Sequence, residues 1–238
     1  MIVCSLSFFL WWKNPNSKWV SMLNTERNKV SKTLGPLFSI VLMSMMIYWS
    51  CFLMLGVWSS AENVALFMTA MRTAMLISFV LSAVNSISAP KFASLYHQGD
   101  KEGLRKTALS SVRLMVIVAV PALMLMLMIP ELIMSLFGEE FLIAAPLLQI
   151  LAVGQFVNVI SGSVGHLLQM TGHECLLRRN VFISGTVILI GGCIFIPIYG
   201  IYGAAWVTTV SIVIQNLLCV KDVKKALGFN SMAFWQKA

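Results

Sequence analysis

The chain has 238 residues, of which 58% are hydrophobic and only 11% are charged, and its formal net charge is +8. With a mean hydropathy of +0.85, a water-soluble globule of this composition would expose large apolar patches, so lipid is the expected solvent. The basic residues lie in short clusters between long apolar runs, where they would meet anionic lipid headgroups. This placement argues against a nucleic-acid partner.

Six mostly uncharged runs are long enough to cross a bilayer, which takes about 20 apolar residues. In chain order they are 34–58, 62–89, 108–129, 142–170, 181–198 and 201–220. The last two share one uncharged stretch that the segment IPIYGIYG interrupts, and its Pro and Gly residues predict a tight hairpin. The expected fold is an all-α polytopic transmembrane helical bundle of about six spans.

The loops predict the orientation of these spans. Nearly all of the 17 Lys and Arg residues precede the first span, lie in the second and fourth loops, or follow the last span. The charged residues of the alternate loops are all acidic, namely Glu62, Glu131, Glu139 and Glu140. Because Lys and Arg accumulate in short cytoplasmic loops, both termini are predicted to be cytoplasmic.

The apolar start of the chain, residues 2–12, reaches only about half-way across a bilayer as a helix. A signal peptide would need a basic region before it and an Ala-x-Ala site after it, and the sequence has neither. We therefore expect residues 1–33 to hold the end of a truncated helix and a cytoplasmic amphipathic connector. Residues 34–220 are then a six-helix lobe, and residues 221–238 a cytoplasmic tail.

Motifs of catalysis or metal binding are absent from the sequence. It contains no nucleophile elbow, Walker loop, zinc signature or paired carboxylates, and its five cysteines have no metal-ligand spacing. The sequence therefore predicts neither an enzyme nor a cofactor or metal site. Polar groups inside the bilayer are costly, and they are the candidates for function.

Two arginines lie within the predicted spans. Arg72 is about 15 Å below Glu62 along its helix, near the midplane of the membrane. It is expected either to face a water-filled cavity and meet an anionic substrate such as a lipid pyrophosphate, or to hold the bundle together through interhelical hydrogen bonds. Arg113, nearer the cytoplasmic end of the third span, either binds substrate as well or extends to the headgroups.

The fourth span carries a polar stripe. Six residues fall within an arc of about 100° in helical projection: Gln155, Asn158, Gly162, Gly165, His166 and Gln169. Such a stripe lines an aqueous cavity or allows close helix contact with hydrogen bonds across it, so the four polar members are candidate substrate-binding residues. Alone, His166 is consistent with proton coupling or with a satisfied polar histidine.

Pro121 lies inside the third span, where it removes a helical hydrogen bond and permits a bend. This bend is either a hinge used in transport or a static kink of the kind that membrane helices tolerate.

Three segments carry a resemblance to a known family. They are ALFMTAMRTAMLISFVLSAVNSISAPKFASLYHQGDKEGL (65–104), LFGEEFLIAAPLLQILAVGQFVNVISGSVGHLLQMTGHE (136–174) and IPIYGIYGAAWVTT (196–209). With Pro36 opening the first span, their order resembles the bacterial polysaccharide (O-antigen type) flippases of the multidrug/oligosaccharidyl-lipid/polysaccharide exporter superfamily. The resemblance covers roughly residues 34–228.

The resemblance implies two six-helix lobes around a central cavity, which move undecaprenyl-pyrophosphate-linked sugars across the bacterial inner membrane by alternating access. This chain resembles the C-terminal lobe, with Arg72 in the lobe's second helix, where a basic residue is often seen. The implied partners are membrane lipid and either the missing N-terminal lobe or a second copy of the chain.

Two other functions are compatible with the sequence. A cation-coupled drug exporter lobe would be expected to have a membrane-embedded carboxylate, and no predicted span contains Asp or Glu away from its ends. A truncated remnant that inserts but transports nothing would also fit the half-length chain.

Overall fold

The computed structural model describes residues 17–232, with side chains described throughout from residue 37. This part of the chain is helical and contains no strand. Its elements are α2 (Ser17–Trp58), α3 (Ala61–His97), α4 (Lys101–Met128), α5 (Pro130–Ser135), the 3-10 helix η1 (Glu139–Ala144), α6 (Ala145–Ser161), α7 (Val164–Met170) and α8 (Glu174–Leu227). The predicted truncated helix within residues 1–12 lies outside the described residues.

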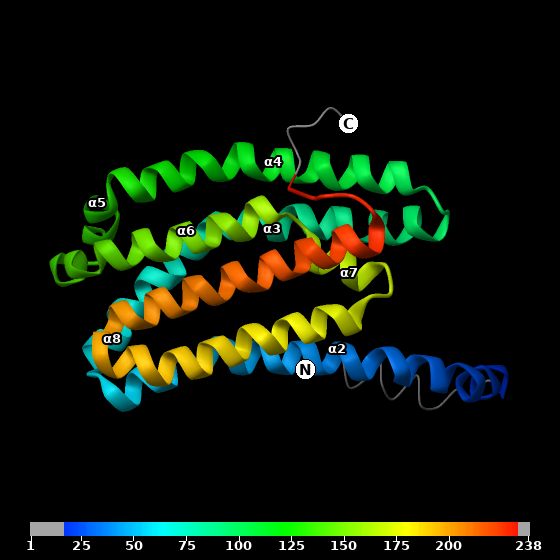
Figure 1. Cartoon of the computed structure of the whole chain (residues 1–238), viewed down its shortest axis with the longest axis horizontal. Helices are drawn as coiled ribbons and strands as arrows, with labels where there is room; N and C mark the ends of the chain where they lie inside the picture. Colours follow the sequence, from blue (N-terminus) through cyan, green and yellow to red (C-terminus); the bar gives the residue numbers. More distant parts are fainter. Residues whose placement is uncertain (1–16, 233–238) are drawn as a thin grey trace.

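The long helices pack alongside one another into a bundle (Figure 1). Five helical segments are long and apolar enough to cross a membrane: Leu37–Trp58, α3, α4, Glu139–Ser161 and α8. A straight helix of 54 residues would be about 80 Å long, more than twice the thickness of the hydrocarbon core. Instead α8 bends back at Gly200, which has the non-helical angles φ 56° and ψ −130°. With α8 counted as two arms, the helices agree with about six spans, and the predicted polytopic all-α bundle is confirmed.

The turn of α8 brings its two arms into close contact. A Cβ atom on Gly203 would collide with the carbonyl oxygen of Phe195, so only glycine fits there. Farther along, Ser211 donates a hydrogen bond to the carbonyl of Ser184 at 2.8 Å, and Ser184 donates to Gln215 at 2.9 Å. The hairpin predicted from IPIYGIYG is therefore present, and polar contacts hold its arms together.

Other polar side chains join neighbouring helices of the bundle. Thr209 of α8 donates to the carbonyl of Ile150 in α6 at 3.1 Å. Gln149 of α6 donates to the carbonyl of Leu127 at 2.9 Å, which satisfies a group left without a helical partner at the end of α4. Since lipid solvates apolar helix faces well, such bonds and close packing stabilise the bundle.

The fourth predicted span, 142–170, differs in the structure. Gly162 (φ 77°, ψ −158°) ends α6, and α7 begins after it as a separate short helix. A Cβ atom on Gly162 would collide with Cγ2 of Val112, so α4 and the end of α6 approach too closely for any side chain there. The predicted span therefore consists of two helices rather than one, because the backbone of Gly162 leaves the helical conformation and ends α6.

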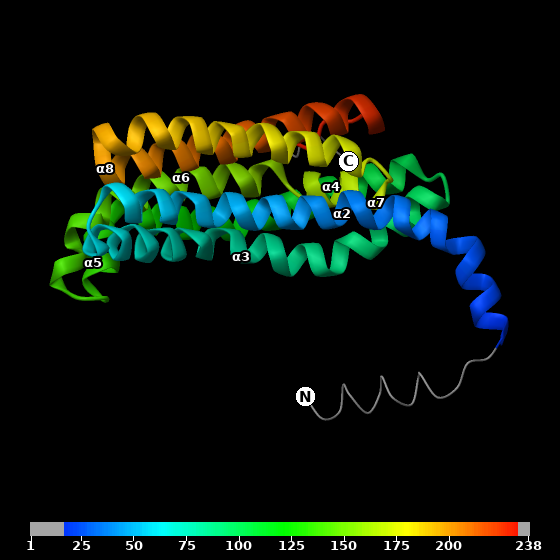
Figure 2. The same ribbon diagram turned by 90° about the horizontal axis from the view of Figure 1, so that it is seen from below.

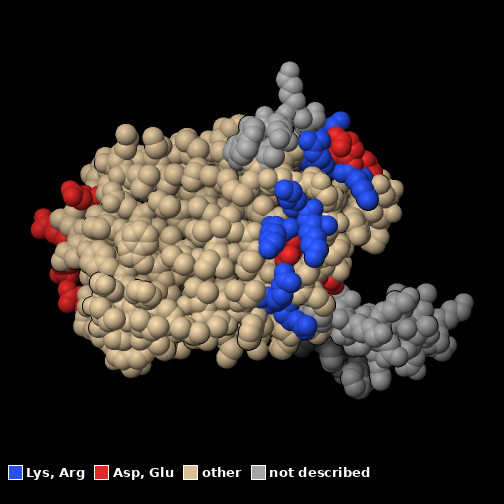
Figure 3. Space-filling model, in the orientation of Figure 1, with Lys and Arg blue, Asp and Glu red and all other residues tan. Residues whose placement is uncertain are grey.

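Charge is divided between the two ends of the bundle (Figure 3). The visible Lys and Arg residues gather at one end, where acidic residues also occur, whereas the opposite end shows acidic residues alone. The acidic end includes the start of α3, α5 and η1, which carry Glu62, Glu131, Glu139 and Glu140. Figure 2 shows the N-terminal part of α2 turning away from the bundle at the basic end.

We expect Gly162→Ala to lower the free energy of unfolding by about 2–4 kcal/mol, because alanine would meet both the positive φ and Val112. Thermal and denaturant unfolding in detergent would measure the change. Gly56→Ala is the matched control, since Gly56 is a helical glycine and an added methyl group there would have no atom within 4 Å. Equal stability of the Gly162→Ala protein and the wild type would contradict the close packing.

Candidate functional site

A cavity of about 410 Å³ lies between α2, α3, α6 and α8. Its walls are apolar in part, from residues such as Phe52, Phe67 and Met71. Its polar lining consists of Ser44, Tyr48, Cys51, Gln155, Asn158, Thr208, Gln215 and Asn216. No Lys, Arg, Asp or Glu is among the lining residues, so the cavity is polar but without formal charge.

A second cavity of about 180 Å³ adjoins the first, because Asn158, Gln215 and Asn216 line both. It extends to the break between α6 and α7, where Ser163 donates a hydrogen bond to Asn85 of α3. His166 of α7 also lines it. The two cavities form a polar cleft within the helix bundle.

Gln155 and Asn158 lie one turn apart on α6 and meet the same residue of α3. Ser78 donates a hydrogen bond to Oε1 of Gln155 at 2.5 Å, and Nδ2 of Asn158 lies 3.5 Å from the Ser78 hydroxyl. The Gln155 side chain is buried. Ser78 thus fixes both amides at the wall of the cleft, where they suit water or the hydroxyl groups of a neutral ligand.

The polar stripe predicted for the fourth span is brought together in part. Gln155, Asn158 and His166 line the cleft, although His166 belongs to a separate helix. Gln169, half-buried on α7, lines neither cavity. Gly162 and Gly165 also line the smaller cavity, so five of the six residues of the predicted stripe line the cleft.

The two arginines lie elsewhere. Arg72 is exposed on α3, and neither cavity includes it, although its neighbour Met71 lines the larger one. Arg113 is half-buried on α4 and also lines neither cavity. Pro121 lies in α4, which continues as a helix through it to Met128. The cleft and Arg72 are thus two separate features of the bundle.

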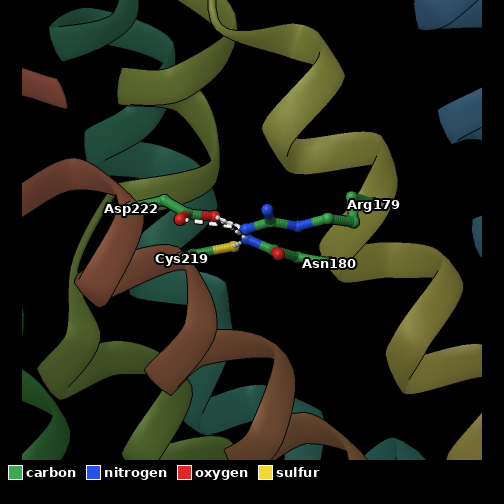
Figure 4. A network of polar contacts seen from close by, with 4 residues as sticks. All are labelled: Arg179, Asn180, Cys219 and Asp222. Carbon is green, nitrogen blue, oxygen red and sulfur yellow. Dashed lines mark hydrogen bonds and ion pairs between the residues drawn. The ribbon is translucent and has the colours of Figure 1, made fainter. Parts of the chain in front are cut away.

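A polar network near the basic end was not anticipated from the sequence (Figure 4). Asp222, which is buried, accepts two hydrogen bonds from Nη2 of Arg179 at 3.0 and 2.8 Å and one from Nδ2 of Asn180 at 2.8 Å. The same amide nitrogen lies 3.5 Å from Sγ of Cys219. The network joins the first arm of α8 to its second arm, which continues to Leu227 through residues that the sequence predicted to be a tail.

One signal for this network is visible in the sequence. Asp222 is the lone acidic residue in the basic segment KDVKK (221–225). Within the described range, no group of three or more His, Cys, Asp or Glu residues is placed to hold a metal ion.

The fold is that of a polytopic helical membrane protein, and its interior cleft has no Lys, Arg, Asp or Glu in its lining. A family model described as MatE matches residues 36–191, and the chain belongs to this family. The resemblance to the exporter superfamily is thereby confirmed at the level of the family.

The chain is 26% identical over 208 residues to the "Probable low-salt glycan biosynthesis flippase Agl15" of Haloferax volcanii. The aligned region covers 87% of this chain and 42% of that protein. It is 30% identical over 146 residues to the "Uncharacterized membrane protein MJ1068" of Methanocaldococcus jannaschii, or 59% of this chain and 28% of that protein. In both cases the match spans less than half the relative's length. No solved structure matches the chain.

We expect Asp222→Ala to cost about 2–3 kcal/mol of stability, because the buried amide of Asn180 loses its carboxylate acceptor and keeps only the contact with Sγ of Cys219. A double-mutant cycle with Arg179→Ala should give a coupling of only about 1 kcal/mol, since Arg179 is 53% exposed and water screens the pair. Unfolding in detergent measures both values. Glu174→Ala, at the same end and with no partner among the described side chains, should change stability by less than about 1 kcal/mol.

Proposed function

We propose that the chain is the C-terminal six-helix lobe of a flippase that moves lipid-linked oligosaccharide across the bacterial inner membrane. The substrate would be an undecaprenyl-pyrophosphate-linked sugar unit for cell-surface polysaccharide such as O-antigen of lipopolysaccharide. Membership of the MatE family supports a transport role, and the similarity to a protein described as a glycan biosynthesis flippase supports the substrate class.

The observation that carries the proposal is the exposure of Arg72. It lies about 16 Å along α3 from Ala61, inside a segment long and apolar enough to cross the membrane. The exposed neighbours on its face include Leu76 and Phe79, and no ion pair joins Arg72 to another described residue. A cation facing hydrocarbon is costly, so this face of α3 needs water or another protein against it.

A second lobe against α3 would enclose such a water-filled space. Arg72 would then lie at the wall of a central cavity, where its guanidinium can bind a pyrophosphate through paired charge-assisted hydrogen bonds. We assign the neutral groups Gln155, Asn158 and His166 to the interior of the lobe, where they accommodate water or sugar hydroxyls as the helices rearrange. The bend that Pro121 permits in α4 would serve that rearrangement.

Arg113 and Gln169 have supporting roles in this proposal. Both are half-buried and both lie outside the cleft lining. We place them on the path of the substrate toward the cytoplasmic surface rather than beside Arg72.

The proposed orientation has the basic end and both termini in the cytoplasm, by the positive-inside rule. In a variant whose five cysteines are replaced by serine or alanine, Glu139→Cys should react with a membrane-impermeant thiol reagent in intact cells. Lys101→Cys should react only after the membrane is permeabilised. The reverse pattern would contradict the orientation.

We expect Arg72→Ala to reduce polysaccharide export at least tenfold in cells that depend on the complete transporter, because a charge-assisted hydrogen bond to phosphate contributes at least that factor. Arg72→Lys, which keeps the charge but not the paired donors, should retain part of the export. Immunodetection of surface polysaccharide, normalised to transporter abundance in the membrane, is the measurement.

Arg178→Ala is the matched control. Arg178 is also exposed, but it lies at the basic end in the first turns of α8, and its removal changes the net charge equally. Export should stay near the wild-type level in this variant. Normal export by the Arg72→Ala protein would show that Arg72 does not bind the substrate.

A further inference from the structure

A groove of about 390 Å³ runs between α3 and α4 and shares no lining residue with the interior cleft. It is lined by Val84, Ile87 and Lys91 of α3 and by Lys106, Ser110 and Leu114 of α4, with further hydroxyl groups between them. Lys91 lies about 28 Å along α3 from Arg72, so the groove is also distinct from the substrate site proposed at Arg72.

The groove changes from basic to apolar along its length. On α3, Val84 lies about 10 Å from Lys91 toward the middle of the bundle, and on α4, Leu114 lies about 12 Å from Lys106 in the same direction. Ile87, which is 77% exposed, lies between these ends. The groove therefore has two lysines at the membrane surface and an apolar lining at the depth of the acyl chains.

Hydrogen bonds fix the floor of the groove. The buried hydroxyls of Ser88 and Ser111 lie 3.0 Å apart and join α3 to α4, and Ser111 also bonds to the carbonyl of Thr107 at 2.9 Å. The hydroxyl of Ser110 is exposed at the rim, close in sequence to Lys106. The groove is thus a formed surface with hydroxyl donors next to its lysines.

Nearby acidic groups are engaged by other partners. Glu102 pairs with Arg105 at 3.4 Å, and Asp100 accepts a hydrogen bond from the Gly103 amide at 2.8 Å. Lys91 and Lys106, by contrast, form no ion pair with any side chain in the described part of the chain. Two such lysines on either side of one groove attract an anion from outside the protein.

We infer that this groove binds one anionic phospholipid of the membrane. Lys91 and Lys106 hold the headgroup phosphate, with Ser110 donating a hydrogen bond, and an acyl chain lies along Val84, Ile87 and Leu114. Basic pockets between transmembrane helices at the cytoplasmic side suit lipid headgroups for this reason. The inference goes beyond the proposed transport function, because it concerns a resident lipid on the outer surface of the lobe.

Native mass spectrometry of the purified full chain in detergent, titrated with phosphatidylglycerol or phosphatidylcholine, tests the site. The wild type should retain phosphatidylglycerol preferentially. Lys91→Gln combined with Lys106→Gln should lower that affinity about 25-fold, because each lysine near an anionic headgroup contributes about fivefold. The matched control, Lys224→Gln with Lys225→Gln, removes two exposed lysines from the last turn of α8, also at the basic end of the bundle. Its affinity for phosphatidylglycerol should stay within about twofold of the wild type.

The double arginine variant, Lys91→Arg with Lys106→Arg, should bind phosphatidylglycerol as the wild type does, and this separates charge from folding. Ile87→Asn should also weaken binding of the lipid, because it removes apolar surface where the acyl chain lies. Soluble phosphate should still not displace the lipid from this variant. Equal losses in both glutamine pairs, or no preference for phosphatidylglycerol, would overturn the site. Displacement of the lipid by millimolar inorganic phosphate would show a free-anion site instead. None of these readouts requires export, so their failure is distinct from failure of the flippase proposal.

Discussion

The bundle depends on one constraint: inside the hydrocarbon, every backbone polar group must find its partner within the protein. Helices satisfy the backbone, and the polar side chains then bond to neighbouring helices rather than to solvent. Ser184 with Gln215 and Gln155 with Ser78 are examples between segments far apart in the sequence. Because apolar helix faces are already well solvated in lipid, these contacts and the close approach of glycines select one arrangement of the helices.

The apolar helices and the hairpin were predictable because their signals are local. Long apolar runs define spans, and the Pro and Gly residues near Gly200 mark the point at which α8 turns. The break at Gly162 was not predictable in this way. Glycine is common in membrane helices, and the need for it here comes both from the positive φ of Gly162 and from the contact with Val112 on α4, which no local pattern reveals.

The candidate site was predictable in the same partial manner. Helical periodicity correctly grouped Gln155 with Asn158, because both lie on the unbroken part of α6. Beyond the break, His166 of the predicted stripe still lines the cleft, whereas Gln169 lies outside its lining. The partners of Asp222 are 43 and 42 residues distant along the chain, so pattern reasoning placed this aspartate in a cytoplasmic tail.

The placement of charge follows from the cost of burying it. The cleft inside the bundle has a lining of apolar and uncharged polar side chains, and Asp222, a buried carboxylate, is held by both Arg179 and Asn180. An unpaired cation inside the lobe would lack such compensation, so Arg72 and the groove lysines lie on outer faces. It follows that a lobe of this kind recognises an anion only where its surface meets water, headgroups or another lobe. In the flippase that we propose, the pyrophosphate site would therefore form by assembly of two lobes, whereas the interior cleft of this bundle would serve neutral groups.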